Sequence, residues 1–258
     1  MRIDILPTTE SIVQAEITGH TAVVFDILRA TTTIVTAIAH GCRRVIPVLE
    51  AAEAREVAER LAGENIPVLV AGERGGRKIP GFPCGNSPLE YPPEVVGGQT
   101  LVLTTSNGTR ALNAAAQKAR TVLVGSLLNA RAVAQEACRL GRNVTMVCAG
   151  TQGQFSLEDI LGAGMVVLEI LEMVEPGWLR LSARQPSALD LTDLAVAALH
   201  LAHAYLENPR RAFDHASHGR KLLNMGLAAD LDWCASLNTF QVVPVVKNDN
   251  GFLSIENG

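Results

Sequence analysis

Several residue types and patterns are scarce in this chain of 258 residues, and each scarcity excludes some classes of protein. Aromatic residues make up only 4%, and no apolar run is long enough to cross a membrane, so we expect no membrane partner. The N-terminus contains no signal-peptide core. The five cysteines never form a Cys-x-x-Cys pair, which argues against disulfides and zinc. We therefore expect a cytoplasmic protein with reduced thiols.

An excess of positive charge is also absent. The formal net charge is −4, so the composition provides no general attraction to nucleic acid, and we expect no nucleic-acid partner. Hydrophobic residues make up 48% of the chain and charged residues 19%. These proportions are typical of a soluble α/β protein with a full hydrophobic core.

Familiar catalytic motifs are missing too. No cysteine is followed six positions later by arginine, as the cysteine-phosphatase loop requires. Leu28 stands two positions after Asp26, where the paired-aspartate phosphatase motif has a second aspartate. There is no G-x-S-x-G elbow, no G-x-G-x-x-G after a strand and no G-K-[ST] phosphate loop. Any catalytic site must therefore use other residues.

What is present is an alternation of short apolar runs with helical patterns. This order predicts an α/β fold with a mostly parallel sheet and helices on both faces. The expected strands are Arg2–Leu6, Ala22–Ile27, Arg44–Leu49, Pro67–Ala71, Thr100–Thr104, Thr121–Gly125, Asn143–Ala149 and Phe240–Val246. The expected helices are Thr32–Ala39, Glu50–Ala62, Gly108–Ala119, Ala130–Leu140 and Leu157–Met173.

The domain organisation has two interpretations. The chain is either one compact unit or two related α/β halves, residues 1–125 and 126–246, with the site between them. Residues 190–236 are predicted to be helical without a strand, and the polar residues 247–258 are expected to form a peripheral tail. The connection from Glu73 to Pro93 is rich in glycine and proline and long for a connector, which is typical of a functional loop.

The segment Val23–Thr33 carries the first candidate residues. An apolar run ends in Asp26, and Arg29 and three threonines follow before a helix. Ligands bind at such strand ends in open α/β sheets. Asp26 is predicted to be a catalytic residue and a metal ligand, whereas Arg29 and Thr31 would bind substrate. The alternative is that Asp26 and the threonines only start the helix.

A second group of candidates follows the expected strand Pro67–Ala71. Glu73 and Arg74 directly precede the Gly75-Gly76 pair, whose backbone can approach an anion closely. Glu73 is predicted to be a metal ligand and Arg74 to bind substrate. A solvated turn is the other interpretation.

The loop Thr104–Arg110 can cradle an oxyanion with hydroxyl, amide and backbone donors. Here Asn107, Gly108, Thr109 and Arg110 are predicted to bind substrate, although Asn107 can also act as a helix cap.

Three further segments contribute candidates. In Gly85–Glu90, Ser87 fits a helix cap and Asn86 a ligand contact. In Gly150–Asp159, Ser156 and Asp159 fit a capping box, which leaves Glu158 as a catalytic residue and metal ligand.

Near the C-terminus, His218 is predicted to be catalytic and Ser217 to bind substrate, although a structural histidine at a helix end is an equal alternative. Because acids outnumber histidines at the strand ends, the sequence favours Mg²⁺ over zinc.

Together these motifs resemble the 2-phosphosulfolactate phosphatase (ComB) family. The matching segments, in order, are Asp26–Thr33, Gly72–Gly76, Gly85–Pro88, Thr104–Thr109, Ala149–Asp159 and Ser217–Gly219. The resemblance implies a Mg²⁺-dependent hydrolysis of 2-phospho-3-sulfolactate to 3-sulfolactate and phosphate, a step toward coenzyme M. The sequence departs from the family pattern at Ser106, where relatives often carry threonine, and at Pro83-Cys84.

The candidate residues agree with such a substrate. Phosphate, carboxylate and sulfonate groups need several cations. The expected cations are Arg29, Arg74, Arg77, Lys78 and Arg110. We expect water to attack phosphorus with Glu158 as the base, and the protein to be a homo-oligomer such as a dimer. The alternatives are a phosphatase for another small 2-phospho acid and a non-catalytic protein that binds anions or nucleotides.

Overall fold

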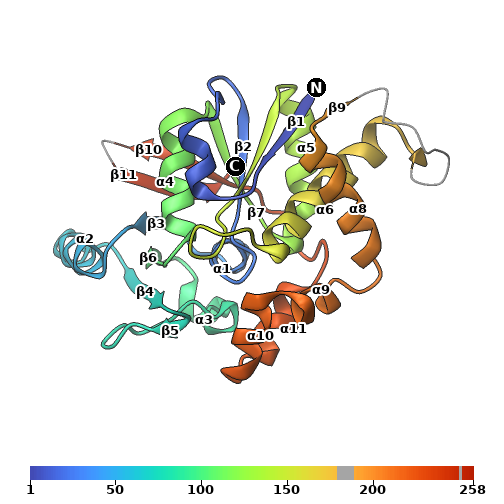
Figure 1. The fold of residues 1–258 in the computed structure, drawn as a ribbon. Coiled ribbons are helices and arrows are strands. Elements are labelled where there is room, and N and C mark those ends of the chain that lie inside the picture. The colour runs from blue at the N-terminus through green and yellow to red at the C-terminus, as the bar shows by residue number, and fades with distance from the viewer. Residues whose placement is uncertain (179–188, 250–251) are drawn as a thin grey trace.

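The computed structural model describes residues 1–178, 189–249 and 252–258. Within these ranges one sheet runs through the molecule in the order β5-β4-β6-β3-β11-β10-β7-β2-β8-β1-β9 (Figure 1). The strands are β1 Arg2–Leu6, β2 Thr21–Phe25, β3 Arg44–Val48, β4 Val68–Arg74, β5 Arg77–Lys78, β6 Thr100–Thr104, β7 Thr121–Gly125, β8 Val144–Cys148, β9 Asp190–Leu191, β10 Pro244–Asp249 and β11 Phe252–Asn257. The expected α/β fold with a mostly parallel sheet is confirmed.

Helices cover both faces of the sheet. They are α1 Ala30–Ala39, α2 Ala51–Gly63, α3 Pro93–Val96, α4 Gly108–Lys118, α5 Ala130–Leu140, α6 Leu157–Val174, α8 Asp193–Tyr205, α9 Arg210–His215, α10 Ser217–Asn224 and α11 Ala228–Cys234. Short 3₁₀ helices cover Thr9–Val13, Pro88–Glu90 and Leu127–Asn129. No helix in the described part of the chain combines the length and apolar character needed to span a membrane.

The helix sequences account for these two layers. Helix α6 is buried along most of its length and packs with α5 and α8 on the face that includes Ile3, Val23 and Met146. Helices α1 and α4 bury their apolar residues with Val24, Leu103 and Val124 on the other face. Alternate residues of β2 therefore enter different cores, because successive side chains of a strand point to opposite faces. Buried on both faces, β2 reads as a continuous apolar run.

The sheet contains two parallel groups of strands. One group is β4, β6 and β3, and the other is β7, β2, β8, β1 and β9. Between them lies the hairpin β10–β11, which pairs antiparallel with both neighbours. The three antiparallel steps make β3 run opposite to β7. The boundary expected at residue 125 does not separate these groups, since β8 lies between β1 and β2.

Three expectations about secondary structure are wrong. Residues 252–257 are not part of a peripheral tail, because β11 pairs with β10 and β3 inside the sheet and buries Ser254 and Ile255. The short strand β9 pairs with β1 within a segment expected to be helical. In the glycine-rich connection, β4 continues to Arg74 and forms a hairpin with β5.

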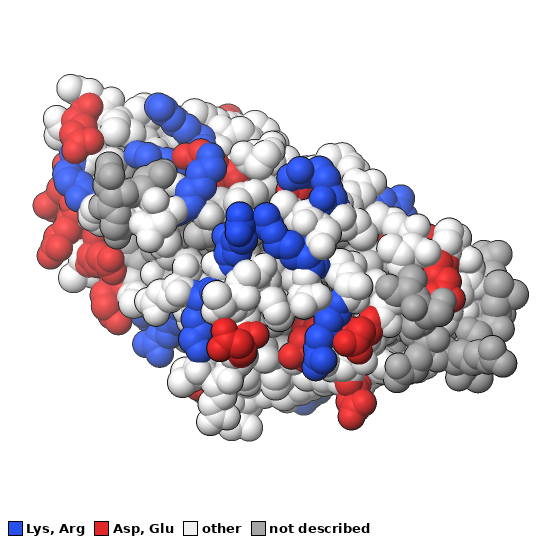
Figure 2. All heavy atoms as spheres, turned by 90° about the horizontal axis from the view of Figure 1, so that it is seen from above, with Lys and Arg blue, Asp and Glu red and all other residues white. Residues whose placement is uncertain are grey.

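The surface carries both signs of charge. Figure 2 shows the molecule from above the view of Figure 1, and there basic side chains gather toward the middle, with acidic ones among them and toward the rim.

Candidate functional site

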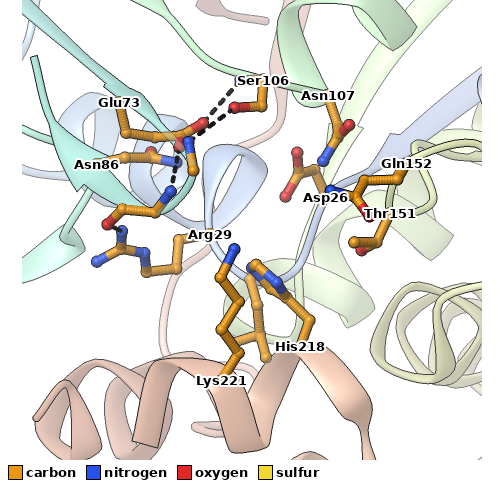
Figure 3. Close-up of a pocket in the computed structure, with 13 residues that line it drawn as sticks. Asp26, Arg29, Glu73, Asn86, Ser106, Asn107, Thr151, Gln152, His218 and Lys221 are labelled. Carbon is orange, nitrogen blue, oxygen red and sulfur yellow. Dashed lines mark hydrogen bonds between the residues drawn. The ribbon is translucent and has the colours of Figure 1, made fainter. Parts of the chain in front are cut away.

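A cavity of about 180 Å³ lies where the C-terminal ends of both parallel groups meet helix α10 (Figure 3). This volume corresponds to about six water molecules, so it suits a small ligand. We call Asp26, Glu73 and Asn107 the strand side of the pocket, because each lies in or just after a strand. We call His218 and Lys221, with the buried Asp230 behind them, the helix side.

Asp26 follows β2 directly and lines the pocket. Its Oδ1 accepts a 3.3 Å hydrogen bond from the Ala30 N–H. A Cβ on residue 108 would lie 2.8 Å from Asp26 Oδ2 and 2.5 Å from the Ala30 Cβ, so the site requires glycine there. The pKa of Asp26 is raised to about 7, chiefly by burial; the nearby Glu73 and Glu158 also raise it, and hydrogen bonds from the Ala30 and Gly108 N–H groups oppose the shift.

Glu73 points into the pocket from β4. Its Oε1 accepts a hydrogen bond from the Ser106 N–H and its Oε2 one from the Gly76 N–H, both at 2.7 Å. The bond from Ser106 joins β4 to the loop after β6, and the bond from Gly76 lies within the turn between β4 and β5 (Figure 3). The carboxylate is therefore held in place, and each of its oxygens keeps a second lone pair for a ligand.

Arg29 lines the pocket, but its guanidinium is largely occupied. One terminal nitrogen donates to Asp230 Oδ2 at 2.6 Å, and the other donates to the Gly76 carbonyl at 2.9 Å. Both partners of the ion pair are 4% exposed. Asp230 Oδ1 accepts from the Ser87 hydroxyl, so Ser87 does not cap the following helix as expected. This network fastens α11 to the strand ends.

The threonines after Asp26 form the framework of the turn rather than the pocket wall. Thr31, predicted to bind substrate, is fully buried, and its hydroxyl accepts the Asp26 N–H at 3.0 Å. Thr32 donates to the Ile27 carbonyl, and Thr33 donates to the Asn86 carbonyl. The Leu28–Arg29 peptide bond within this turn is cis. The prediction for Thr31 is therefore corrected.

Two predicted substrate arginines also lie outside the pocket. Arg74 extends along the sheet edge, where it donates to the Glu73 and Leu49 carbonyls and to the Thr104 hydroxyl. Arg110 is exposed on α4. Their side chains do not supply the pocket's positive charge.

Helix α4 begins with residues of different roles. Asn107 lines the pocket, and its side chain makes no capping hydrogen bond, so the capping alternative is wrong. Gly108 permits the close approach of Asp26 described above. Thr109 is fully buried and exchanges hydrogen bonds with Thr105, so its predicted substrate contact is corrected to a structural one.

Asn86 is placed where the sequence analysis expected a ligand contact. The residue is 5% exposed and lines the pocket. Its Oδ1 is buried and has no hydrogen-bond partner among the described residues. Burying a hydrogen-bond acceptor without a partner costs free energy. We therefore expect a ligand, a cation or a water molecule to bind this oxygen.

The two acids at the start of α6 lie behind the pocket. Asp159 accepts hydrogen bonds from the Ile27 and Gly150 N–H groups, and the Ser156 side chain caps α6. Asp159 and Ser156 therefore have the predicted structural roles. Glu158 is 3% exposed and does not line the cavity, so the geometry gives no support to its expected roles as base and metal ligand. Burial raises the pKa of Glu158, and its charge acts on Asp26.

Helix α10 contributes one predicted and one unexpected residue. His218 lines the pocket with Nδ1 buried and without a partner among the described residues. Burial and the charges of Lys221 and Arg29 lower the pKa of His218, while Glu73 opposes them. Ser217 is exposed and bonds to Arg220 instead of lining the cavity. Lys221 was missed, although its spacing from His218 puts both on one helix face.

The donors of the pocket can be compared with the needs of Mg²⁺. Among the described residues, no group of three or more His, Cys, Asp or Glu side chains is arranged to hold a metal ion. Mg²⁺, however, commonly uses one or two carboxylates and completes its shell with water and phosphate oxygens. Asp26, Glu73 and the unpartnered Asn86 Oδ1 form an all-oxygen set of this kind, so the residues fit the ion.

The fold and pocket define an α/β protein whose site combines paired carboxylates with basic groups, as a site for a small anionic ligand requires. Residues 6–249 match the family described as 2-phosphosulpholactate phosphatase, and the chain belongs to this family.

Curated relatives support the same placement. A protein of Carboxydothermus hydrogenoformans is 38% identical over 257 residues, covering 100% of this chain and 98% of its own length. A protein of Clostridium acetobutylicum is 36% identical over 248 residues, which cover 96% of this chain and 98% of the relative. A protein of Symbiobacterium thermophilum is 41% identical over 230 residues, which cover 89% of this chain and 92% of the relative. Each is named "Probable 2-phosphosulfolactate phosphatase".

Proposed function

We propose that this chain is a Mg²⁺-dependent phosphatase that hydrolyses 2-phospho-3-sulfolactate to 3-sulfolactate and phosphate. The observation that carries the proposal is the meeting of Asp26, Glu73 and the unpartnered Asn86 oxygen in one small cavity. The family membership supports the reaction type. The proposed reaction takes place in the cytoplasm, in line with five cysteines that are all free thiols.

Asp26 and Glu73 would hold Mg²⁺, with Asn86 Oδ1 as a neutral oxygen donor. The bound ion would neutralise charge on the phosphoryl oxygens. Asp26 suits this role because burial near two other acids disfavours its charged form, and a cation would offset that effect. Gly76 and Ser106 keep Glu73 oriented through their N–H groups.

In the hydrolytic step, a water oxygen bonds to phosphorus as the bond between phosphorus and the C2 oxygen breaks. His218 Nδ1 takes the water proton, since its lowered pKa keeps the imidazole neutral at neutral pH. The leaving C2 oxygen takes a proton from solvent water to give the hydroxyl of sulfolactate, and His218 afterwards releases its proton to solvent. The Asn107 side chain, which lines the cavity and does not cap α4, would donate to a phosphoryl oxygen.

The test is phosphate release from 2-phospho-3-sulfolactate by the purified protein. We expect activity with Mg²⁺ and its loss with a chelator. Asp26→Asn should lower kcat/KM on the order of a hundredfold or more, as removal of a key electrostatic group does elsewhere. The matched control is Asp193→Asn, because Asp193 is exposed on α8 outside the pocket.

Each outcome has a distinct meaning. Activity that resists the chelator would remove the metal from the proposal. Near-normal turnover of Asp26→Asn would return Asp26 to a structural role. Release of phosphate only from other 2-phospho acids would favour a related phosphatase, and tight sulfolactate binding without any hydrolysis would favour an anion-binding protein. The predicted dimer can be tested by light scattering.

A further inference from the structure

The pocket's positive charge does not come from most of the residues expected to supply it. Of the arginines and lysines expected from the sequence, only Arg29 lines the cavity, and Asp230 neutralises it through a 2.6 Å ion pair. A substrate with three acidic groups needs further positive charge. The remaining basic groups that line the cavity are His218 and Lys221 of α10.

Lys221 differs from the other lysines of the chain. The sequence contains four lysines, and three have acceptors: Lys78 donates to the Pro83 carbonyl, Lys118 to carbonyls of residues 12, 13 and 15, and Lys247 to Glu256. Among the described residues, no hydrogen-bond or ion-pair partner is found for Lys221. Figure 3 shows its side chain extending from α10 toward the space that Asp26 and Glu73 face.

The position of Lys221 is fixed by the fold. Helix α10 packs on α9 and α11, and α11 is fastened to the strand ends by the buried Arg29–Asp230–Ser87 network. Lys221 also shares a helix face with His218, whose ring lies in the cavity. Its ammonium therefore faces the pocket across from the carboxylates.

We propose that Lys221 binds one of the two acid groups, carboxylate or sulfonate, that the substrate carries beside its phosphate, and so selects phosphorylated acids over simple phosphate esters. This inference rests on the proposed function. The acidic strand side would hold Mg²⁺, which would bind the phosphoryl group, whereas a carboxylate or sulfonate needs a direct cation. Because the cavity is only about 180 Å³, a three-carbon substrate with its phosphoryl group on the strand side places one acid group near α10.

Two substrates separate this role from phosphoryl binding. The first is 2-phospho-3-sulfolactate, and the second is isopropyl phosphate, which has no second acid group. Lys221→Ala should lower kcat/KM for the first substrate at least about tenfold more than for the second, mainly through KM, since a charged hydrogen bond is lost. Lys78→Ala removes the same charge outside the pocket and should leave both values near wild type.

A binding measurement makes the test independent of turnover. Calorimetric titration with 3-sulfolactate should show about tenfold weaker binding to Lys221→Ala than to the wild type, and Lys221→Arg should recover part of the loss. Equal losses for both esters, or unchanged sulfolactate binding, would overturn the assignment. If the wild type hydrolyses neither ester, the proposed function fails, while the titration still decides the role of Lys221.

Discussion

The strand side and the helix side of the pocket solve the problem of buried charge differently. On the strand side, Asp26 and Glu73 lie close enough to interact, and the buried Glu158 adds to their repulsion. On the helix side, the buried Asp230 is matched by Arg29 at 2.6 Å. Among the described residues, one side thus holds acids without an ion-pair partner, and the other holds a neutralised pair.

This difference indicates what each side does. An acidic cluster that burial makes unfavourable is suited to bind a cation, since the ion removes the cost of the buried charge. A buried ion pair with its hydrogen bonds satisfied is suited to fix the position of neighbouring groups, although it adds little net stability. The strand side therefore suits the proposed binding of metal and phosphoryl group, and the helix side positions Lys221 and His218.

The largest expected effect concerns the pH dependence of the metal-free protein. Between pH 4 and 7 the folded protein keeps a proton on Asp26, whose pKa is raised to about 7, while the unfolded chain releases it near pH 3.8. The free energy of unfolding should therefore fall as pH rises through this window. A shift of this size corresponds to about 4 kcal/mol.

Urea denaturation in the presence of a chelator measures this effect. The pH dependence should be weaker in Asp26→Asn, which carries no charge at this position, than in the wild type. Mg²⁺ should stabilise the wild type most above pH 7. Identical pH profiles for the two proteins would show that Asp26 is not a costly buried charge, and the contrast between the two sides would disappear.

An effect of similar size concerns the helix side. Asp230→Ala leaves the Arg29 charge buried without its partner, and we expect a loss of about 3–5 kcal/mol in the free energy of unfolding. Asp232→Ala on the same helix removes an acid whose side chain is 69% exposed in its pair with Arg210. That control should cost at most about 1 kcal/mol.

Denaturation midpoints and slopes of both variants give the comparison. The double variant Arg29→Met with Asp230→Leu should recover much of the loss, because no unpaired charge remains. If Asp230→Ala were as stable as Asp232→Ala, the buried pair would not hold α11 in place, and the position assigned to Lys221 would lose its basis.

Much of the strand side could be predicted from the sequence. Apolar runs that end in Asp26 or lead to Glu73 mark strand ends, and strand ends of an α/β sheet collect ligand-binding residues. The core strands are also visible, since strands buried on both faces read as apolar runs. Strand β11 was missed because its three apolar residues stand in a short, otherwise polar C-terminal segment, and its place in the sheet comes from pairing with β10 and β3.

The helix side could not be predicted in the same way. Lys221 becomes a pocket residue only when α10 docks. Docking depends on the contacts of Asp230 with Arg29, which lies 201 positions earlier in the chain, and with Ser87, which lies 143 positions earlier. The threonines illustrate a different limit. A hydroxyl that closes a turn and one that binds phosphate give the same sequence pattern, and only the hydrogen bond from the Asp26 N–H to Thr31 separates them.

The smallest expected effect tests, at Arg74, whether a residue with a promising position in the sequence binds substrate or only supports the fold. Its sequence position beside Glu73 suggests substrate binding, but its guanidinium bonds to the Leu49 carbonyl and the Thr104 hydroxyl at the sheet edge. Arg74→Ala should therefore change kcat/KM by about threefold or less, under ~0.7 kcal/mol. Lys221→Ala, measured beside it with 2-phospho-3-sulfolactate, should show the larger loss. A reversed order would place the functional cation at the strand side and restore the interpretation that the sequence alone favours.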